Sequence, residues 1–368
     1  MLHDDRSKAP DTPACAGPRR RRPGLARTVT ASPGTSTSRW SWQRRPTRAL
    51  VCVLTAAVLA AVTSACGSGS GARAGAAAGG VEKSTVTVRV IPTADLAPMY
   101  LAMQRGYFAA EGLTVKPQLI QNGSVAIQAM QQGSLDVVNA SYVSFFLAQS
   151  KGAAFKVVSD GYQAGANMQV VVTLPGSPIR HVRDLAGKRI GVGTPQSIAQ
   201  LAAMSTLQTN GVNPAGVKFV QVDWDKMAVA LRTKRIDAAY ELEPYLSGDQ
   251  QRYGVVKVFD AMAGPTADLA LSGYVTTADW ARKYPRTFAA FQRAMAKGQA
   301  AAADRSAVER ILPTFTKIDA KAASVINLGS YPTTVSKVRL QRVVDLMVTF
   351  GLLPSADKAG LDSMLSTP

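Results

Sequence analysis

The amino-acid sequence predicts an α/β protein with two similar lobes, each a mostly parallel sheet flanked by helices. From Thr85 onward, apolar runs rich in β-branched residues alternate with helix-forming segments, which is the pattern of a parallel sheet. In addition, the segment AMQQGSLDVVNAS at 129–141 is followed about a hundred residues later by a segment of similar pattern, ALRTKRIDAAYELEP at 230–244. Asp136 and Asp237 therefore occupy matching places. A length of 368 residues also suits two lobes.

The first alternating run begins at Thr85 and ends at Asp160. Pro98 is expected near the start of its first helix and Gly112 at its end, because proline suits the first helical turn and glycine ends helices. Strands are predicted at 85–91, 113–120, 135–141 and 155–160, and helices at 97–112, 123–133 and 142–152.

The second run repeats this order. We predict strands at 184–195 (with its lead-in), 216–224, 236–244 and 255–261, and helices at 196–212, 225–235 and 244–254. In this alignment Arg189 matches Arg89, and Gly211 matches Gly112. An alternative is that any parallel α/β sheet contains such phrases. Agreement in order and spacing over four elements favours two related lobes.

The chain is expected to cross between the two lobes twice. We predict one crossing near Val171 and a return near Ser272, so that 85–171 and 272–368 form the first lobe and 172–271 the second. Residues 278–368 are predicted to be helical, because apolar residues recur there at spacings of three and four. These helices are expected to pack on the first lobe.

The first 65 residues have the order of a secretory signal. Basic stretches come first, an uncharged apolar run from Ala49 to Ala65 follows, and small residues lead to Cys66. A membrane-spanning helix needs about 20 apolar residues and a basic flank, whereas a glycine-rich stretch follows here. We therefore expect residues 1–65 to be removed and residues 66–84 to form a flexible tether.

Cysteine usage supports the same reading. Cys15 and Cys52 lie in the removable segment, so the mature chain would keep Cys66 alone and form no internal disulfide or cysteine metal cluster. The run TSACGSGS resembles the lipobox of bacterial lipoproteins, with Thr63 where leucine is usual. This resemblance implies that Cys66 is lipidated and that the protein is anchored on the outer face of the cell membrane.

The charge pattern argues against a nucleic-acid-binding protein. The formal net charge is +18, but part of it falls in residues 1–65. After Cys66 the basic residues are scattered singly along predicted helices, whereas a nucleic-acid site needs them clustered with aromatic residues.

Four segments together resemble a known family: APMYLAMQRGYFAAEGLTV, GSLDVVNASYVSFFLAQSKG, DLAGKRIGVG and the stretch ending IDAAYELEP. They are similar to the solute-binding proteins of bacterial ABC importers in the nitrate, sulfonate, taurine and thiamine-precursor group. The resemblance implies a two-lobed periplasmic-binding-protein fold of type II, with two hinge crossings. It further implies a monomer without cofactor or metal, which closes on a small solute and delivers it to a permease and an ATPase.

The position of the solute follows from the fold class. In open α/β sheets, ligands lie outside the carboxyl ends of the strands and beside helix N-termini, so two facing lobes place two sets of such loops in one cleft. The matching loops of the family line the solute site as well. The candidate ligand-binding residues are Thr93, Asp95, Leu96, Asn122, Gly123, Ser124, Ser141, Tyr142, Tyr162, Asn167, Thr194, Gln196, Ser197, Trp224, Tyr240, Glu241 and Glu243.

Several of these candidates have structural alternatives. Ser124, Ser197 and Asp95 are also suited to capping helices, and Glu243 before Pro244 is suited to starting one. The aromatic candidates, Trp224 and Tyr142, are alternatively core or rim residues. If Tyr142 and Glu243 do bind the solute, replacing either with alanine should weaken binding and leave the stability of the solute-free protein unchanged.

The residue types in the candidate loops indicate which kinds of solute would suit them. None of the candidate loops carries Lys or Arg, whereas Asp95, Glu241 and Glu243 supply carboxylates. Carboxylates beside hydroxyl groups and aromatic rings suit an aliphatic sulfonate of the taurine type, which is a zwitterion, or a pyrimidine thiamine precursor. A bare dianion would depend on backbone N–H groups and hydroxyl groups alone.

An enzyme of the same fold that makes a thiamine-type pyrimidine is the alternative from another class. That activity would need a histidine and a cysteine-rich loop, but His181 is the one histidine after the signal region, and it precedes a predicted surface helix. No G-x-S-x-G, HExxH or P-loop motif is present. A transcriptional regulator would need a DNA-binding helix pair before Thr85, where the secretion signal stands. The sequence therefore favours a receptor over an enzyme.

Overall fold

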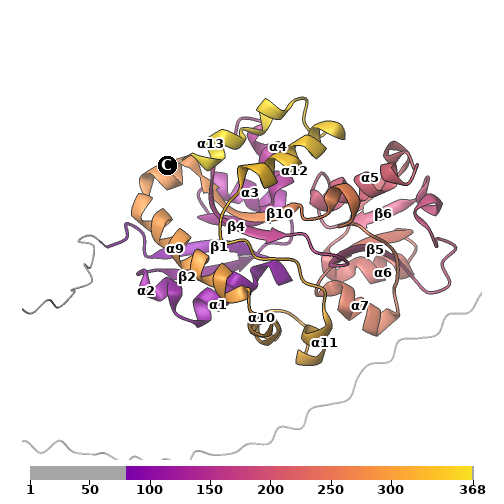
Figure 1. Cartoon of the computed structure of the whole chain (residues 1–368), viewed down its shortest axis with the longest axis horizontal. Helices are drawn as coiled ribbons and strands as arrows, with labels where there is room; N and C mark the ends of the chain where they lie inside the picture. Colours follow the sequence, from indigo (N-terminus) through magenta and orange to yellow (C-terminus); the bar gives the residue numbers. More distant parts are fainter. Residues whose placement is uncertain (1–79, 367–368) are drawn as a thin grey trace, which may run out of the picture. The chain divides into compact units, whose positions relative to one another are not determined.

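The computed structural model describes residues 80–366, which contain two five-stranded sheets side by side (Figure 1). The predicted signal region, Cys66 and most of the predicted tether lie outside these residues. The first sheet has the order β2-β1-β3-β10-β4, with β1 at Thr85–Val90, β2 at Thr114–Leu119, β3 at Val137–Ser141, β4 at Phe155–Gln163 and β10 at Ala270–Thr277. The second has the order β7-β6-β8-β5-β9, with β5 at Gln169–Thr173, β6 at Arg189–Val192, β7 at Lys218–Gln221, β8 at Ala238–Leu242 and β9 at Val256–Asp260.

Each sheet is mostly parallel and contains one reversed strand. β10 pairs antiparallel with β3 and β4, and β5 pairs antiparallel with β8 and β9. Both reversed strands are the first strand that the chain forms after it passes from one sheet to the other. The alternation of strands and helices therefore predicts the parallel part of each sheet, and the reversed strands result from the crossings.

The crossings lie a few residues before the predicted positions. β4 ends at Gln163 and β5 begins at Gln169, so the first passage occupies 164–168 and Val171 already belongs to the second sheet. The buried run around Val171 pairs with β8 and β9, which fixes it in that sheet. The return passage occupies 261–269, and Ser272 lies within β10.

Most helices cover the two sheets as expected. Those of the first sheet's N-terminal half are α1 (Ala97–Gln104), α2 (Tyr107–Ala110), α3 (Gly123–Gln131) and α4 (Tyr142–Gln149), and those of the second sheet are α5 (Ile198–Thr209), α6 (Met227–Arg232) and α7 (Tyr245–Tyr253). The helix predicted at 97–112 is broken in two, because Gly106 adopts a left-handed φ of 70° that an α-helix cannot contain.

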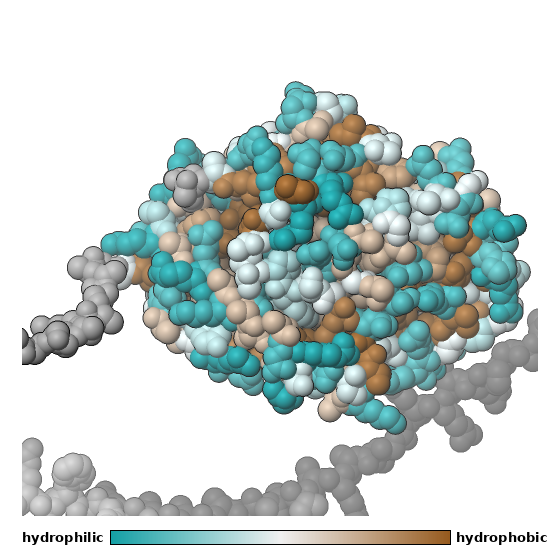
Figure 2. All heavy atoms as spheres, in the orientation of Figure 1, coloured by the Kyte–Doolittle hydropathy of each residue, from teal (hydrophilic) through white to brown (hydrophobic). Residues whose placement is uncertain are grey.

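The C-terminal part of the chain is helical and packs mainly on the first lobe. It contains α8 (Ala278–Lys283), α9 (Pro285–Ala302), α10 (Arg305–Ile311), α11 (Ala320–Val325), α12 (Lys337–Thr349) and α13 (Leu361–Leu365). In α9, Phe288, Phe291 and Met295 are buried in one cluster with Val86 and Val88 of β1. On the face drawn in Figure 2, apolar residues form small patches between polar ones. No helix within residues 80–366 is long and apolar enough to cross a membrane.

The duplicated phrase has a structural counterpart in the two lobes. Asp136 precedes β3, and its carboxylate accepts a hydrogen bond from the backbone N–H of Thr87 at 2.8 Å. Asp237 precedes β8, and its carboxylate accepts one from the backbone N–H of Arg189 at 2.8 Å. Each aspartate thus ties the start of one strand to the neighbouring parallel strand. Thr87 is therefore the counterpart of Arg189, which corrects the predicted match of Arg89 with Arg189 by two residues.

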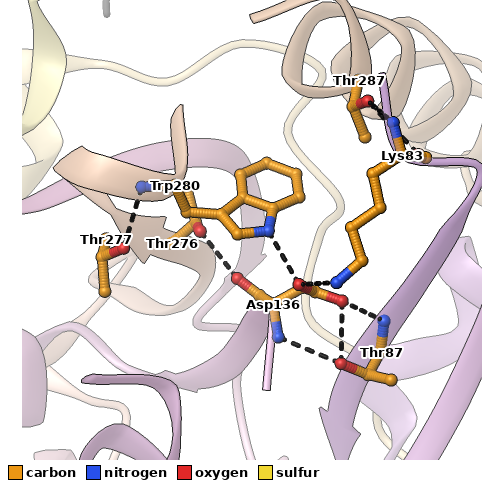
Figure 3. Close-up of polar contacts among 7 residues, drawn as sticks. All are labelled: Lys83, Thr87, Asp136, Thr276, Thr277, Trp280 and Thr287. Atoms are coloured by element: carbon orange, nitrogen blue, oxygen red, sulfur yellow. Dashed lines mark hydrogen bonds and ion pairs between the residues drawn. The ribbon is translucent and has the colours of Figure 1, made fainter. Parts of the chain in front are cut away.

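In the first lobe this aspartate is the centre of a larger polar cluster (Figure 3). The Asp136 carboxylate, 4 % exposed, also accepts hydrogen bonds from Lys83 Nζ at 2.5 Å, Trp280 Nε1 at 2.7 Å and Thr87 Oγ1 at 2.9 Å. Its backbone carbonyl accepts one from Thr276 Oγ1 at 2.6 Å. The cluster joins the segment before β1 to β3, β10 and α8.

Candidate functional site

A cavity of about 100 Å³, partly open to solvent, lies between the two lobes where their strands end. Ser141, at the end of β3, and Thr93, after β1, line it from the first lobe. Thr194, after β6, and Trp224, after β7, line it from the second lobe. This is the place that the rule for open α/β sheets predicts.

Ten of the residues predicted from the sequence line this cavity. They are Thr93, Asp95, Gly123, Ser141, Tyr162, Thr194, Ser197, Trp224, Tyr240 and Glu243. They come from loops far apart in the sequence, which the two sheets bring to one place.

Three of the other predicted residues have a local structural role. Leu96 is fully buried in the first lobe. Asn122 is the N-cap of α3, where its Oδ1 accepts hydrogen bonds from the backbone N–H groups of Ser124 and Val125. Asn167 adopts a φ of 59° in the first crossing, and its Oδ1 accepts a hydrogen bond from Lys257 Nζ at 2.7 Å.

Four more predicted residues lie away from the cavity. Ser124 and Gln196 line a separate hollow between α3, α4 and the turn before α5. Tyr142, the first residue of α4, is fully buried, and its hydroxyl group donates to Asp160 Oδ1 at 2.7 Å. Glu241 is fully buried too, but it lies on β8 between Tyr240 and Leu242, which both line the cavity. Alternation along the strand turns Glu241 away from the cavity, toward α7.

The cavity wall contains a cation that the rule for strand ends does not predict. Arg89, on β1, lines the cavity and is 3 % exposed. Its guanidinium donates hydrogen bonds to the backbone carbonyls of Ile120 at 2.7 Å, Asn139 at 2.6 Å and Gln121 at 2.9 Å. Burial lowers the pKa of Arg89 to about 10, so it keeps its charge at neutral pH. A single charged residue inside the apolar strand TVTVRVI was the signal that could have revealed it.

Some of the further lining residues come from strands rather than from the loops that the sequence predicts. Gln169 of β5 lines the cavity, and its Oε1 accepts a hydrogen bond from the hydroxyl group of Tyr240 at 2.6 Å. The other lining residues that sequence reasoning did not select include Ile91, Asn139, Ser144, Met168, Leu242 and Ser272. The reversed strands β5 and β10 supply three of the missed lining residues, Gln169, Leu271 and Ser272, and the parallel-sheet rule does not predict what reversed strands contribute.

Two carboxyl groups line the same cavity as Arg89. Asp95 accepts hydrogen bonds from the hydroxyl groups of Thr93 and Ser272, the latter at 2.9 Å. Burial raises the pKa of Asp95, and these hydrogen bonds and Arg89 oppose that rise. Burial likewise raises the pKa of Glu243, which accepts hydrogen bonds from the N–H group and the hydroxyl group of Ser247. The cavity therefore offers both a cationic group and acidic groups.

The lobes touch each other at the edge of the cavity. Ser141 Oγ of the first lobe accepts a hydrogen bond from the backbone N–H of Ile198, at the start of α5, at 3.2 Å. The backbone carbonyl of Glu243 accepts one from the N–H of Ala94 at 3.4 Å. These contacts join the two lobes directly.

A pair of carboxyl groups lies behind the cavity wall. Both side-chain oxygens of Glu241 are buried, and no other described residue donates a hydrogen bond to them. Burial raises the pKa of Glu241 well above its usual value, and the neighbouring carboxyl group of Asp249 in α7 raises it further. Burial raises the pKa of Asp249 as well. The raised pKa values of the two groups lead us to expect that they share a proton, which supplies the missing donor.

This pair predicts an unusual pH dependence. Because the folded protein binds this proton more tightly than the unfolded chain, whose glutamate pKa is near 4.5, stability is lost as pH rises from about 4.5 through the folded pKa. Glu241→Gln supplies an N–H donor at every pH. We expect it to raise the free energy of unfolding by about 1–2 kcal/mol at pH 8 and to change it little at pH 4.

The measurement is urea denaturation at both pH values. The matched control is Glu309→Gln, which breaks the surface ion pair with Arg305 at 2.7 Å and should change stability by less than about 0.5 kcal/mol at either pH. A Glu241→Gln variant that is less stable than the wild type at pH 8 contradicts the shared proton.

Comparisons with known proteins agree with this architecture. The riboflavin-binding protein RibY of Chloroflexus aurantiacus is 26% identical over 231 residues, which are 60% of this chain and 62% of that protein. A putative aliphatic sulfonates-binding protein of Bacillus subtilis is 24% identical over 199 residues, which are 53% of this chain and 58% of that protein. The chain thus spans less than two thirds of the length of either relative.

A solved structure has the same fold. The alkanesulfonate-binding protein SsuA from Xanthomonas axonopodis pv. citri, bound to MOPS, matches with a TM-score of 0.64 at 16% identity, over 75% of this chain and 96% of that one. The periplasmic-binding-protein fold implied by the sequence is thereby confirmed. The family model described as NMT1/THI5 like matches residues 93–306, which is more than half of the sequence. The chain belongs to the NMT1/THI5-like family.

Proposed function

We propose that this chain is the solute-binding receptor of an ABC importer and works outside the cytoplasm. It would close on a small organic solute and deliver it to a permease driven by an ATPase. The observation that supports this most is the cavity between two look-alike lobes, lined from both sides by hydroxyl, amide and aromatic groups. The names of the relatives, which include a riboflavin-binding and a sulfonates-binding protein, point to the same role.

The proposed mechanism is closure of the lobes on the solute. A solute that touches both lobes binds the closed form better, so its binding free energy shifts the population from open to closed. A micromolar solute provides about 8 kcal/mol at standard state, part of which offsets the cost of closure. The contacts of Ser141 with Ile198 and of Ala94 with Glu243 form only when the lobes meet, and they add to the stability of the closed form.

The charges of the cavity favour a solute with two kinds of polar group. Arg89 attracts an anionic or acceptor group, while Asp95 and Glu243 accept hydrogen bonds from donors. An aliphatic sulfonate of the taurine type carries both an anion and an ammonium group and is our first candidate. The aromatic side chains of Tyr162, Trp224 and Tyr240 in the wall favour, as second candidate, a planar nitrogen heterocycle such as a pyrimidine thiamine precursor.

The proposal includes a place in the cell. Lipidation of Cys66 would hold the receptor on the outer face of the membrane, with residues 66–84 as a tether. Mass spectrometry of the membrane fraction tests this: an acylated N-terminal Cys66 is expected, whereas an intact leader in the cytosol contradicts it. We propose a receptor rather than a pyrimidine-synthesis enzyme, because His181 is exposed and does not line the cavity.

Calorimetry on the purified full-length chain tests solute binding. Taurine, methanesulfonate, riboflavin, 4-amino-5-hydroxymethyl-2-methylpyrimidine and nitrate are the probes. We expect binding of taurine or of a planar heterocycle, and we expect Glu243→Gln to weaken it about tenfold, or ~1.4 kcal/mol, because it removes a charge from the wall. Glu309→Gln, at a residue that does not line the cavity, is the control and should bind like the wild type. Tight binding of nitrate alone, unaffected by Glu243→Gln, overturns the proposed solute class.

A further inference from the structure

The indole ring of Trp224 lies directly against the backbone at Gly193. Gly193 follows β6 and Trp224 follows β7, two neighbouring parallel strands. A Cβ atom placed on Gly193 would lie 2.1 Å from Cε2, 2.2 Å from Cζ2 and 2.6 Å from Nε1 of the indole. Non-bonded carbon atoms need about 3.5–4.0 Å, so no side chain fits between them. The position of the indole therefore depends on the absence of a side chain at residue 193.

Space, rather than backbone conformation, requires glycine here. Gly187 and Gly211 of the same lobe have φ angles of 74° and 76°, which only glycine adopts readily. Gly193 has no such left-handed φ, so alanine suits its backbone. The Cβ atom of an alanine at residue 193 would overlap the indole ring of Trp224.

The internal repeat shows how the two lobes differ at this point. Val88 and Ile190 are equivalent positions of the two lobes. Val88 pairs with the first residue of β3, just after Asp136, and Ile190 pairs with the first residue of β8, just after Asp237. Three residues further along, the counterpart of Gly193 is Ile91, whose own side chain lines the cavity. In the second lobe Trp224, which is 8 % exposed, lines the cavity where that side chain would be.

We propose that Gly193 is a positioning residue for solute recognition: it lets the indole of Trp224 lie flat against the turn before α5 and form one wall of the cavity. The inference rests on the proposed function, because it assumes that this cavity binds the solute. The backbone covers one side of the indole and Trp224 lines the cavity with the rest, so the wall offers a flat aromatic surface to the solute.

A first experiment tests the position of the indole without any solute. The full-length chain is labelled with 5-fluorotryptophan, and the fluorine resonance of Trp224 is assigned by its loss in Trp224→Phe. We expect Gly193→Ala to shift this resonance. The matched control is Gly248→Ala in α7, where an added Cβ meets no atom within 4 Å, and it should leave the resonance in place. An unchanged Trp224 resonance in Gly193→Ala overturns the proposal.

A second experiment uses a double variant to separate positioning from general damage. We expect Gly193→Ala to weaken binding of the tightest of the probes named above tenfold or more. In the Gly193→Ala, Trp224→Phe double variant, the smaller phenyl ring leaves room for the new Cβ. Its affinity and melting temperature should therefore equal those of Trp224→Phe alone. Losses that simply add contradict the proposal.

The two hypotheses fail in different ways. If the wild type binds none of the probes, the proposed solute classes are wrong, while the fluorine resonance still decides the role of Gly193. If the wild type binds a probe and Gly193→Ala binds it equally well, the receptor function stands and the positioning role is wrong. If Gly193→Ala does not fold, recovery of folding in the double variant supports the role, and its absence contradicts it.

Discussion

Tyr142→Ala is expected to lower the free energy of unfolding by about 3–5 kcal/mol, the range for removing a large aromatic side chain from a core. The ring is fully buried, and its hydroxyl group donates to Asp160 at 2.7 Å. It lies across Gly273 of β10 so closely that a Cβ there would come within 2.4 Å of the hydroxyl oxygen. The sequence favoured a solute contact with unchanged stability, and the structure replaces that expectation.

Urea denaturation of the solute-free chain measures this loss, and Tyr142→Phe is the matched control. Phenylalanine keeps the ring and removes only the hydrogen bond, while Asp160 keeps its ion pair with Arg339 at 2.7 Å. We therefore expect about 1 kcal/mol for Tyr142→Phe. If Tyr142→Ala keeps wild-type stability and loses solute binding, the buried placement of the ring is wrong.

Asp136→Ala should cost about 3 kcal/mol of stability, because it leaves several donors without their acceptor. The carboxylate accepts hydrogen bonds from Thr87, Trp280 and Lys83 in the cluster of Figure 3. The Lys83 side chain is 35 % exposed and can turn to water, so its share is small. The backbone N–H of Thr87 and the indole N–H of Trp280 account for most of the effect.

The second lobe supplies the control for this prediction at the repeated position. Asp237 forms the same strand contact, but its side chain is 29 % exposed and its partner Arg189 is 39 % exposed. Asp237→Ala should therefore cost only about 1 kcal/mol. Denaturation of both variants by urea tests the difference. Equal losses would mean that burial and the Trp280 contact do not matter.

Much of the fold follows from the sequence, and the exceptions have identifiable causes. Apolar runs and their spacing predict the strands and helices, because these patterns determine which face of each element is buried. The left-handed Gly106 divides a helix that periodicity alone joins. The equivalence of the lobes rests on Asp136 and Asp237, whereas the likeness of Arg89 and Arg189 in the sequence misleads by two positions.

The candidate site is less predictable than the fold. The rule that ligands lie beyond strand ends finds loop residues such as Ser141 and Thr194, because it depends on topology alone. It does not find Arg89, which reaches the cavity from within a strand, or Gln169, which comes from a reversed one. It also selects Tyr142 and Glu241, because side-chain direction at the end of a strand depends on register that a sequence does not show.

The contacts of the segment before β1 bear on how the proposed closing motion would be anchored. Glu82 accepts hydrogen bonds from the backbone N–H groups of Arg286 and Thr287, and Lys83 joins Asp136, so this segment is fastened to the first lobe. A force applied to the chain from its N-terminal side therefore acts on the first lobe and not directly on the second. If Cys66 is anchored to a membrane, as proposed above, the first lobe is the one held near it and the second lobe is the one that moves during closure.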